Sequence, residues 1–134
     1  MSHQTCTVPQ PTLDSLSKIR FNHTVDSCLV LKIDKATLEI LEDFTQSPLD
    51  IEQLADELPE SSPRFLIVSF TQKHSDGRTS TPLVGVYYHP KTSPEQLMLY
   101  ASSVQHLFKN TANVSPVLEL VDKDDLSMEW LSRR

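Results

Sequence analysis

The order of apolar patterns along this chain predicts an α/β (α+β) fold, with a central mixed β-sheet sandwiched by helices on both faces. Residues 64–70 and 82–88 are apolar at nearly every position, which is typical of central strands covered on both sides. A capped amphipathic segment over residues 93–109 follows them and predicts a long surface helix. The length of 134 residues fits a single domain built around this sheet.

The first residues of the chain are polar and contain two prolines, so we expect a flexible N-terminal tail over residues 1–11. Residues 12–134 then form the single domain. We expect no signal peptide, because the tail has neither a basic start nor an apolar core. Cys6 is expected to be an exposed thiol in this tail, and Cys28, which opens an apolar run, to be buried. Free thiols are favoured over a disulfide, and a cytoplasmic location follows.

Residues 12–20 predict the first helix, because apolar residues recur there at helical spacing. Thr12 is the expected N-cap, since its hydroxyl can accept a hydrogen bond from an unpaired N–H of the first turn. Lys18 and Arg20 place positive charge near the C-terminus of this helix, where the helix dipole favours it.

Two strands are predicted next, over residues 28–34 and 37–44, and only two residues separate them, so they should form a hairpin. Apolar side chains alternate on one face of each strand. These are Leu29, Leu31 and Ile33 in the first strand and Leu38, Ile40 and Phe44 in the second. Asp50 and Gln53 then form a capping-box pattern for a short helix, which Pro59 ends.

The link between the two central strands, residues 73–80, contains the tight-turn signal Asp76-Gly77. This hairpin should therefore project beyond the sheet. The chain is predicted to close with a strand over residues 117–121 and a final helix that starts near Asp124 and carries Arg133 at its end.

The long helix is the best-marked element of the sequence. Ser93 is the expected N-cap, and Gln96 completes the capping box. The apolar positions of the helix are Leu97, Tyr100, Ala101, Val104, Leu107 and Phe108.

Few glycines and scattered histidines argue against catalysis. Gly77 and Gly85 are too few for a loop that cradles a phosphate or a dinucleotide. The five histidines form no short pair with metal-ligand spacing, and no Gly-x-Ser-x-Gly motif indicates a serine hydrolase. We therefore expect no enzyme activity, no metal and no cofactor.

The net charge of −6 argues against nucleic acid or an anionic membrane as a partner, because both favour an excess of Lys and Arg. No run of apolar residues approaches the roughly 18 that a membrane-spanning helix needs. A surface helix and two loops without a catalytic group indicate a protein-binding module, which we expect to be a monomer.

Five segments of the sequence carry a shared family pattern in register. They are LKIDK (31–35), DELPE with PRF (56–65), H-x-DGR-x-S-x-PL (74–83), PEQ-x-M-x-YA-x-S (94–103) and DL-x-x-EWL (125–131). Together they resemble the glia maturation factor family, within the actin-depolymerising-factor homology (ADF-H) superfamily. The resemblance implies binding to the actin-related protein 2/3 complex, inhibition of its actin nucleation, and debranching of filament networks. It also implies a place in the cytoplasmic actin cytoskeleton, with cortical patches and the nucleus as further locations.

The resemblance implies two binding surfaces. The complex-binding surface consists of Lys18, Arg20, Met98, Ser102, Gln105 and Lys109. The daughter-filament surface, which faces actin at the branch junction, consists of Lys73, Asp76, Arg78, Glu129 and Arg133. Simpler roles stay open for several of these residues. Met98 could pack in the core, Lys18 and Arg20 could serve only the helix end, and Asp76 could serve only its turn. Trp130 is expected to be a buried anchor rather than a contact.

Glu95 and Leu97 distinguish the chain from severing ADF/cofilin relatives, which resemble it but carry basic residues at these positions. An acidic residue there opposes association with the acidic actin surface. Direct actin filament binding or severing of the ADF/cofilin or coactosin kind remains the alternative. Relatives often have basic residues where this chain has Asn22, His23, Val104 and His106, so its complex-binding surface is expected to be less positive. Ser2 is a candidate phosphorylation site.

Overall fold

The computed structural model describes residues 6–21 and 25–132 of the 134-residue chain. Its elements follow the order α1 (Gln10–Phe21), β1 (Ser27–Asp34), β2 (Glu39–Gln46), α2 (Ile51–Glu57), β3 (Arg64–Ser69), β4 (Gln72–Lys73), β5 (Thr79–Ser80), β6 (Leu83–Tyr88), α3 (Pro94–Gln105), η1 (His106–Thr111), β7 (Val117–Leu120), η2 (Lys123–Asp125) and α4 (Met128–Ser132). Of these, η1 is a π-helical continuation of α3, and η2 is a single 3-10 turn.

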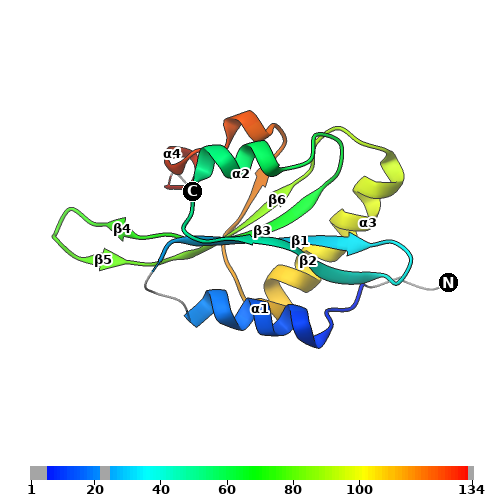
Figure 1. Ribbon diagram of the computed structural model, residues 1–134, viewed down its shortest axis with the longest axis horizontal. Helices are drawn as coiled ribbons and strands as arrows, with labels where there is room; N and C mark the ends of the chain where they lie inside the picture. Colours follow the sequence, from blue (N-terminus) through cyan, green and yellow to red (C-terminus); the bar gives the residue numbers. More distant parts are fainter. Residues whose placement is uncertain (1–5, 22–24, 133–134) are drawn as a thin grey trace.

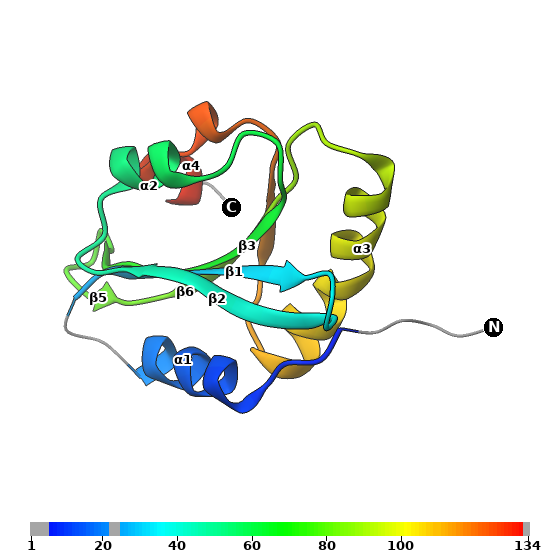
Figure 2. The ribbon, with the colours of Figure 1, turned by 45° about the vertical axis from the view of Figure 1, so that its right-hand side comes forward.

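Five strands form one mixed sheet in the order β2-β1-β3-β6-β7, in which β6 and β7 are the parallel pair. α1 and α3 cover one face of the sheet, and α2 and α4 cover the other (Figures 1 and 2). We name the two buried clusters between these layers the α1–α3 core and the α2–α4 core. The predicted α/β fold, a mixed sheet between two helical layers, is confirmed.

The central position of β3 and β6 is also confirmed, and it explains their continuous apolar sequences. Phe65 and Ile67 point into the α1–α3 core, and Leu66 and Val68 point into the α2–α4 core. Each of these side chains is fully buried. Burial of one such side chain contributes roughly 1.5–3 kcal/mol, so the centre of the sheet is a stable base for the helices on both faces.

The hairpin of β1 and β2 contains a bulge at Asp43, because the register jumps from Phe44 to Glu42 between neighbouring residues of β1. Ile40 lies in the α1–α3 core, whereas Phe44 packs against the α2–α4 core. The prediction that these two residues share a face is wrong, because one extra residue reverses the alternation of side chains. The hairpin itself is confirmed, with a turn over residues 35–38.

An ordered stretch precedes α1, where we expected a flexible tail. Cys6 is completely buried in the α1–α3 core, so the prediction of an exposed thiol is wrong. The Thr7 N–H donates to the Leu38 carbonyl at 2.9 Å, and the Ile40 N–H donates to the Thr7 carbonyl at 2.8 Å. The backbone groups along the edge of β2 need partners, and a polar sequence does not reveal that it will supply them.

The start of α1 also differs from the prediction, since this helix begins at Gln10. Thr12 is not its N-cap. The Thr12 side chain is buried, and its hydroxyl donates to the Ile40 carbonyl at 2.8 Å, which ties the helix to β2. The domain therefore starts before residue 12. Residues 1–5, with the candidate site Ser2, lie outside the described part of the chain.

The long helix begins as predicted, with the Ser93 hydroxyl accepting a hydrogen bond from the Gln96 N–H at 3.3 Å. Its buried face is displaced from the predicted one. Ser103 is buried and Ala101 is exposed, the reverse of their expected places. The polar Ser103 is accommodated because its hydroxyl donates to the Leu99 carbonyl at 3.3 Å. A hydroxyl satisfied within its own helix can face the core, which hydrophobicity patterns do not indicate.

The C-terminal region forms two short elements instead of one helix starting near Asp124. The η2 turn comes first, with the Asp122 carboxylate accepting from the Asp124 N–H at 2.9 Å. α4 starts later, where the Ser127 hydroxyl accepts from the Trp130 N–H at 3.0 Å. Trp130 is partly buried against the α2–α4 core, in keeping with an anchoring role.

Candidate functional site

Arg20 connects the end of α1 to the end of η1. Its guanidinium Nη2 donates to the Ala112 carbonyl and, at 2.9 Å, to the Asn113 carbonyl. Carbonyl groups at the end of a helical segment lack intrahelical partners, and a cation is favourable there. Arg20 is thus held by the backbone of another element. It has a structural role in positioning the complex-binding surface, beyond the helix-end electrostatics expected for α1.

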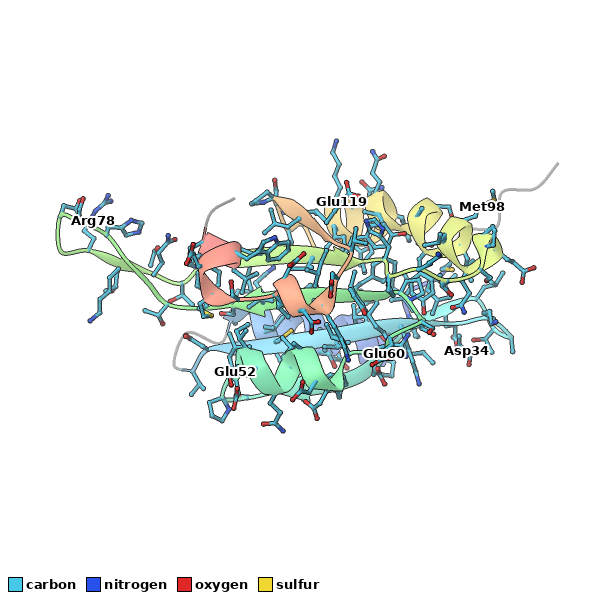
Figure 3. The ribbon with its side chains drawn as sticks, turned by 90° about the horizontal axis from the view of Figure 1, so that it is seen from above. Asp34, Glu52, Glu60, Arg78, Met98 and Glu119 are labelled. Atoms are coloured by element: carbon cyan, nitrogen blue, oxygen red, sulfur yellow. The ribbon has the colours of Figure 1, made fainter. Side chains whose placement is uncertain are left out.

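Four residues of the complex-binding surface form a stripe along α3 and η1. They are Met98, Ser102, Gln105 and Lys109, spaced so that they share one face of a helix. All four are exposed. Met98 is 74% exposed and points away from the body of the molecule (Figure 3), so the alternative of core packing is excluded.

The helix that carries this stripe is packed on an aromatic cluster. Tyr100 and Phe108 lie on its buried face, and their rings meet that of Phe65 at centroid distances of 5.2 and 5.8 Å. The Tyr100 hydroxyl also accepts a hydrogen bond from the Ile33 N–H of β1 at 3.0 Å. Aromatic pairs and a buried hydrogen bond to the sheet hold α3 in one position, so the stripe is preorganised.

Lys18 lies on a different side of α1 from Arg20. Residues two apart on a helix are separated by roughly 200° around the axis. Lys18 lines a depression near the β2 edge, and on that side the Ser15 hydroxyl donates to Glu42 Oε1 at 2.5 Å. The structure therefore brings Arg20 to η1 but does not bring Lys18 to the stripe on α3.

The β4–β5 hairpin carries three residues of the daughter-filament surface and projects beyond the five-stranded sheet, as predicted (Figure 1). Lys73 is exposed and pairs with Thr79. Asp76 accepts from the Arg78 N–H at 3.0 Å and from Arg78 Nε at 2.6 Å. Gly77 has a φ of +91°, which explains why glycine occupies this turn position. Asp76 therefore stabilises the turn, as the simpler alternative expected, and its carboxylate also orients the Arg78 side chain.

The remaining residues of the daughter-filament surface are predicted on α4. Glu129 is exposed on this helix, and Arg133 lies outside the described residues. Figures 1 and 2 place α4 and the base of the β4–β5 hairpin toward the same end of the sheet. The two elements can therefore belong to one surface, separate from the stripe on α3.

Phe21 is an exposed aromatic residue that our sequence reasoning missed. It follows Arg20 at the end of α1 and is 73% exposed. The exposure of Phe21 was predictable from helical spacing. Leu16 and Ile19 mark the buried side of α1, and Phe21 does not lie on that side. Exposed aromatic residues are common at protein interfaces, and Phe21 offers one directly after Arg20.

Glu95 is exposed in the first turn of α3, directly after the cap at Ser93. A carboxylate at this position is stabilised by the unpaired N–H groups and the positive end of the helix dipole. Leu97 is only partly exposed. The first turn of α3 thus presents an acidic surface to a partner.

Three further properties of the described residues concern metal binding, membrane insertion and thiol reactivity. Within residues 6–21 and 25–132, no three His, Cys, Asp or Glu side chains are grouped so that they could hold a metal ion. No helix in that part of the chain is long and apolar enough to span a membrane. Cys28 is fully buried, and burial raises the pKa of its thiol, which disfavours the reactive thiolate.

Residues 5–134 match the family described as cofilin/tropomyosin-type actin-binding protein. The glia maturation factor beta of Homo sapiens is 36% identical over 131 residues, which cover 96% of this chain and 92% of that protein. This chain belongs to the glia maturation factor family. The solution structure of glia maturation factor from Caenorhabditis elegans superimposes with a TM-score of 0.85 at 36% identity, over 100% of this chain and 98% of that one.

More distant structures share the ADF-H fold without sharing the family. Actin depolymerization factor 2 of Plasmodium berghei is 17% identical, with a TM-score of 0.80 over 95% of this chain and 94% of that one. The fold alone therefore does not separate glia maturation factors from other ADF-H proteins. The resemblance of the five sequence segments to glia maturation factor is confirmed, and with it membership of a family of actin-binding proteins.

Proposed function

We propose that this protein binds the actin-related protein 2/3 complex, inhibits its nucleation of actin branches and promotes debranching of existing networks. The observation that best supports this proposal is the acidic first turn of α3 on the scaffold of a glia maturation factor. Glu95 stands there exposed, ahead of the stripe from Met98 to Lys109. Repulsion between Glu95 and the acidic surface of plain actin disfavours that partner and leaves an actin-related subunit as the better one.

Two separate surfaces suit a debranching mechanism. The complex-binding surface docks α3, η1 and the end of α1 on an actin-related subunit of the complex. The daughter-filament surface, with Lys73, Asp76 and Arg78 on the projecting hairpin, faces the first actin subunit of the branch. A ligand shifts a conformational equilibrium only by its difference in affinity for the two states. The protein therefore detaches a branch by binding more tightly to the complex that no longer holds it.

The complex-binding surface carries less positive charge than in many relatives. Val104 and His106 are partly buried where relatives often have basic residues. Charges at the rim of an interface mainly affect the association rate, and each contributes roughly 0–1 kcal/mol. We expect the same docking mode with slower association. Asn22 and His23, which also replace basic residues, lie outside the described residues.

The test is observation of single branches by fluorescence microscopy at saturating protein. We expect branch lifetime to shorten, and an unchanged lifetime would exclude debranching. Met98→Glu places a charge on the docking stripe without disturbing the core, so it should abolish capture of the complex in a pull-down. Glu52→Arg is the matched control, since Glu52 is exposed on α2, on the opposite face of the sheet.

Co-sedimentation with pure actin filaments tests the alternative of direct filament binding or severing. Strong pelleting with filaments in the absence of the complex would favour an ADF/cofilin-like or coactosin-like activity. We expect weak pelleting, because Glu95 opposes the acidic filament surface. We also expect Glu95→Lys to increase pelleting, which would assign the preference to this residue. The proposal places the protein, as a monomer, in the cytoplasmic actin cytoskeleton.

A further inference from the structure

β7 forms an edge of the central sheet. It is hydrogen-bonded to β6, and no other strand among the described residues pairs with it. The Gly85 N–H donates to the Pro116 carbonyl at 3.1 Å and the His89 N–H donates to the Leu120 carbonyl at 2.9 Å. Alternate residues of a strand face opposite neighbours, so the backbone groups of Val117 and Glu119 face outward. An exposed strand edge of this kind can pair with a strand from another chain.

The opposite edge of the sheet differs, because it is already covered. Thr7 pairs with β2 beside Glu39, and the Ser15 hydroxyl of α1 donates to Glu42. The edge of β7 has no corresponding segment beside it among the described residues.

A shallow apolar groove runs beside β7, where α3 crosses the sheet. Its lining residues are Tyr87, Ala101, Val104, Val117 and Glu119. Ala101 is exposed, so the helix side of the groove is small and open. A strand edge next to a helix is the arrangement used for β-strand addition, in which backbone pairing gives affinity and a neighbouring groove selects a side chain.

One carboxylate lines the groove, and others lie beyond the end of β7. The Glu119 side chain is 72% exposed at the margin of the sheet formed by β7, and Figure 3 shows it on the side away from Glu52. Beyond the end of β7, Asp122 and Asp124 are exposed near Tyr88. Their charges, after burial, raise the pKa of the Tyr88 hydroxyl.

Two lysines lie near these carboxylates and offset part of their charge. The Lys123 ammonium is engaged, because it donates to the Leu58 carbonyl at 3.1 Å. Lys91 is exposed beside Glu60, a further carboxylate of this region. His89 forms an ion pair with Glu119 at 2.9 Å when it is protonated. Beyond the end of β7 the carboxylates outnumber the lysines, so the field at that end of the strand favours a basic partner.

We propose that the β7 edge and its groove bind an extended segment of a partner protein, in which an apolar residue is flanked by Lys or Arg. The backbone of the segment pairs with the outward groups of Val117 and Glu119. Its apolar side chain enters the groove at Ala101 and Val104, and a flanking cation meets the Glu119 carboxylate. This site adjoins the stripe of the complex-binding surface, because Ala101 lies three residues after Met98 and four before Gln105 on α3. It does not depend on the proposed function, since peptide binding is measured without the complex.

A second copy of this chain is a poorer occupant of the same edge. Two β7 strands paired with each other would bring their Glu119 side chains close together, and like charges across a strand pair are destabilising. This repulsion favours a foreign basic segment over self-association.

The experiment uses the full chain and two capped seven-residue peptides, one alternating valine with lysine and one alternating valine with glutamate. Backbone NMR reports chemical shifts and amide exchange along β7. We expect the lysine peptide to shift the amide signals of Val117 and Glu119 and to slow their exchange. The glutamate peptide should leave both unchanged at the same concentration. Equal effects of the two peptides, or shifts confined to other elements, would overturn the proposal.

Two variants and one control define the site. Ala101→Trp fills the groove from an exposed position and should weaken the affinity for the lysine peptide by at least about tenfold. Glu119→Gln removes the negative charge and should weaken this affinity by a smaller factor. Glu52→Gln, on the opposite face, should bind as the parent does. Binding unaffected by Ala101→Trp in a variant that melts normally would exclude the groove. Dimers in sedimentation that Glu119→Gln strengthens, without peptide binding, would identify the edge as a self-association site instead.

Discussion

The stripe on α3 and the β4–β5 hairpin both present polar residues to solvent, but they are held in place by different means. The stripe stands on a helix whose other face buries Tyr100 and Phe108 against Phe65 of the sheet. The hairpin is joined by two paired positions and by local bonds such as that between Asp76 and Arg78. The first surface depends on the core of the whole domain, whereas the second depends on residues next to it in sequence.

This contrast predicts different behaviour on binding. A helix supported by a packed core keeps its shape, and its contacts cost little conformational entropy to form. A segment with few buried contacts opens locally at low free-energy cost and can adjust to a partner. We therefore expect the α3 stripe to keep its conformation on binding and the β4–β5 hairpin to adjust to its partner.

The largest expected effect comes from removing the support beneath the stripe. Phe108→Ala deletes a ring that is 1% exposed, and large-to-small changes of this kind cost about 3–5 kcal/mol. We expect such a loss in the free energy of unfolding, measured by chemical denaturation. Thr79→Ala in the hairpin is the comparison and should change this free energy by less than about 0.5 kcal/mol. Similar losses for the two variants would contradict the contrast.

Substitution of the two glycines should also affect the two regions differently, since Gly85 lies beneath the helix of the stripe and Gly77 lies in the β4–β5 turn. A Cβ on Gly85 would lie 2.9 Å from two ring carbons of Phe108, so Gly85→Ala should cost about 1–3 kcal/mol through overpacking. A Cβ on Gly77 meets no atom within 4 Å, but φ there is +91°. Gly77→Ala should therefore strain only the turn, by about 1–2 kcal/mol.

Chemical denaturation and NMR distinguish the two substitutions. Global unfolding should shift for Gly85→Ala, and amide signals of β4 and β5 should change for Gly77→Ala. A global loss for Gly77→Ala as large as that for Gly85→Ala would show that the hairpin is coupled to the core.

Alanine substitutions of Arg20 and Lys18 should change the free energy of unfolding by different amounts, although the two residues are two positions apart on α1. Arg20→Ala removes the donor to the carbonyls of Ala112 and Asn113, so it should lower the free energy of unfolding by about 1 kcal/mol. Lys18→Ala should leave stability within about 0.5 kcal/mol. Thermal unfolding measures both, and a pull-down of the complex then reports binding. Equal stability of the two variants would contradict the inference that Arg20 has a structural role.

The smallest expected effect appears only at alkaline pH. Tyr87 lies in the α1–α3 core, and burial followed by the nearby charge of Glu119 raises the pKa of its hydroxyl. A raised pKa in the folded state means that the associated stability is complete below the unfolded pKa of about 10 and is lost as pH rises above it. Tyr87→Phe should therefore lose less stability than the parent above pH about 10, as measured by denaturation at each pH. Parallel pH profiles for parent and variant would contradict this.

Much of the fold was predictable because it depends on patterns within short segments. Continuous apolar runs indicated the central strands, the Ser93 cap indicated the start of α3, and Asp76-Gly77 indicated the projecting turn. Each signal arises from the conformational preference of a few neighbouring residues. These elements occur where the sequence predicted them.

The errors lie where distant segments meet. Cys6 is buried because Thr7 pairs with β2, and a polar start of the chain does not indicate this. The bulge at Asp43 sends Ile40 and Phe44 into opposite cores. One unpaired residue is invisible in the sequence because it depends on the register chosen by the partner strand.

For the candidate site, the sequence determined the acidic Glu95 in the first turn of the long helix, and its resemblance to the family supplied the residues from Met98 to Lys109. Helical spacing then places these residues on one face, since the period of a helix is about 3.6 residues. Only the tertiary structure decided that Met98 is exposed and that Arg20 reaches the end of η1 while Lys18 lies toward the β2 edge. It also decided that the outer edge of β7 has no strand beside it among the described residues and borders an apolar groove. Exposure and neighbours across the fold depend on how the layers pack, and packing is a property of the whole chain rather than of any segment.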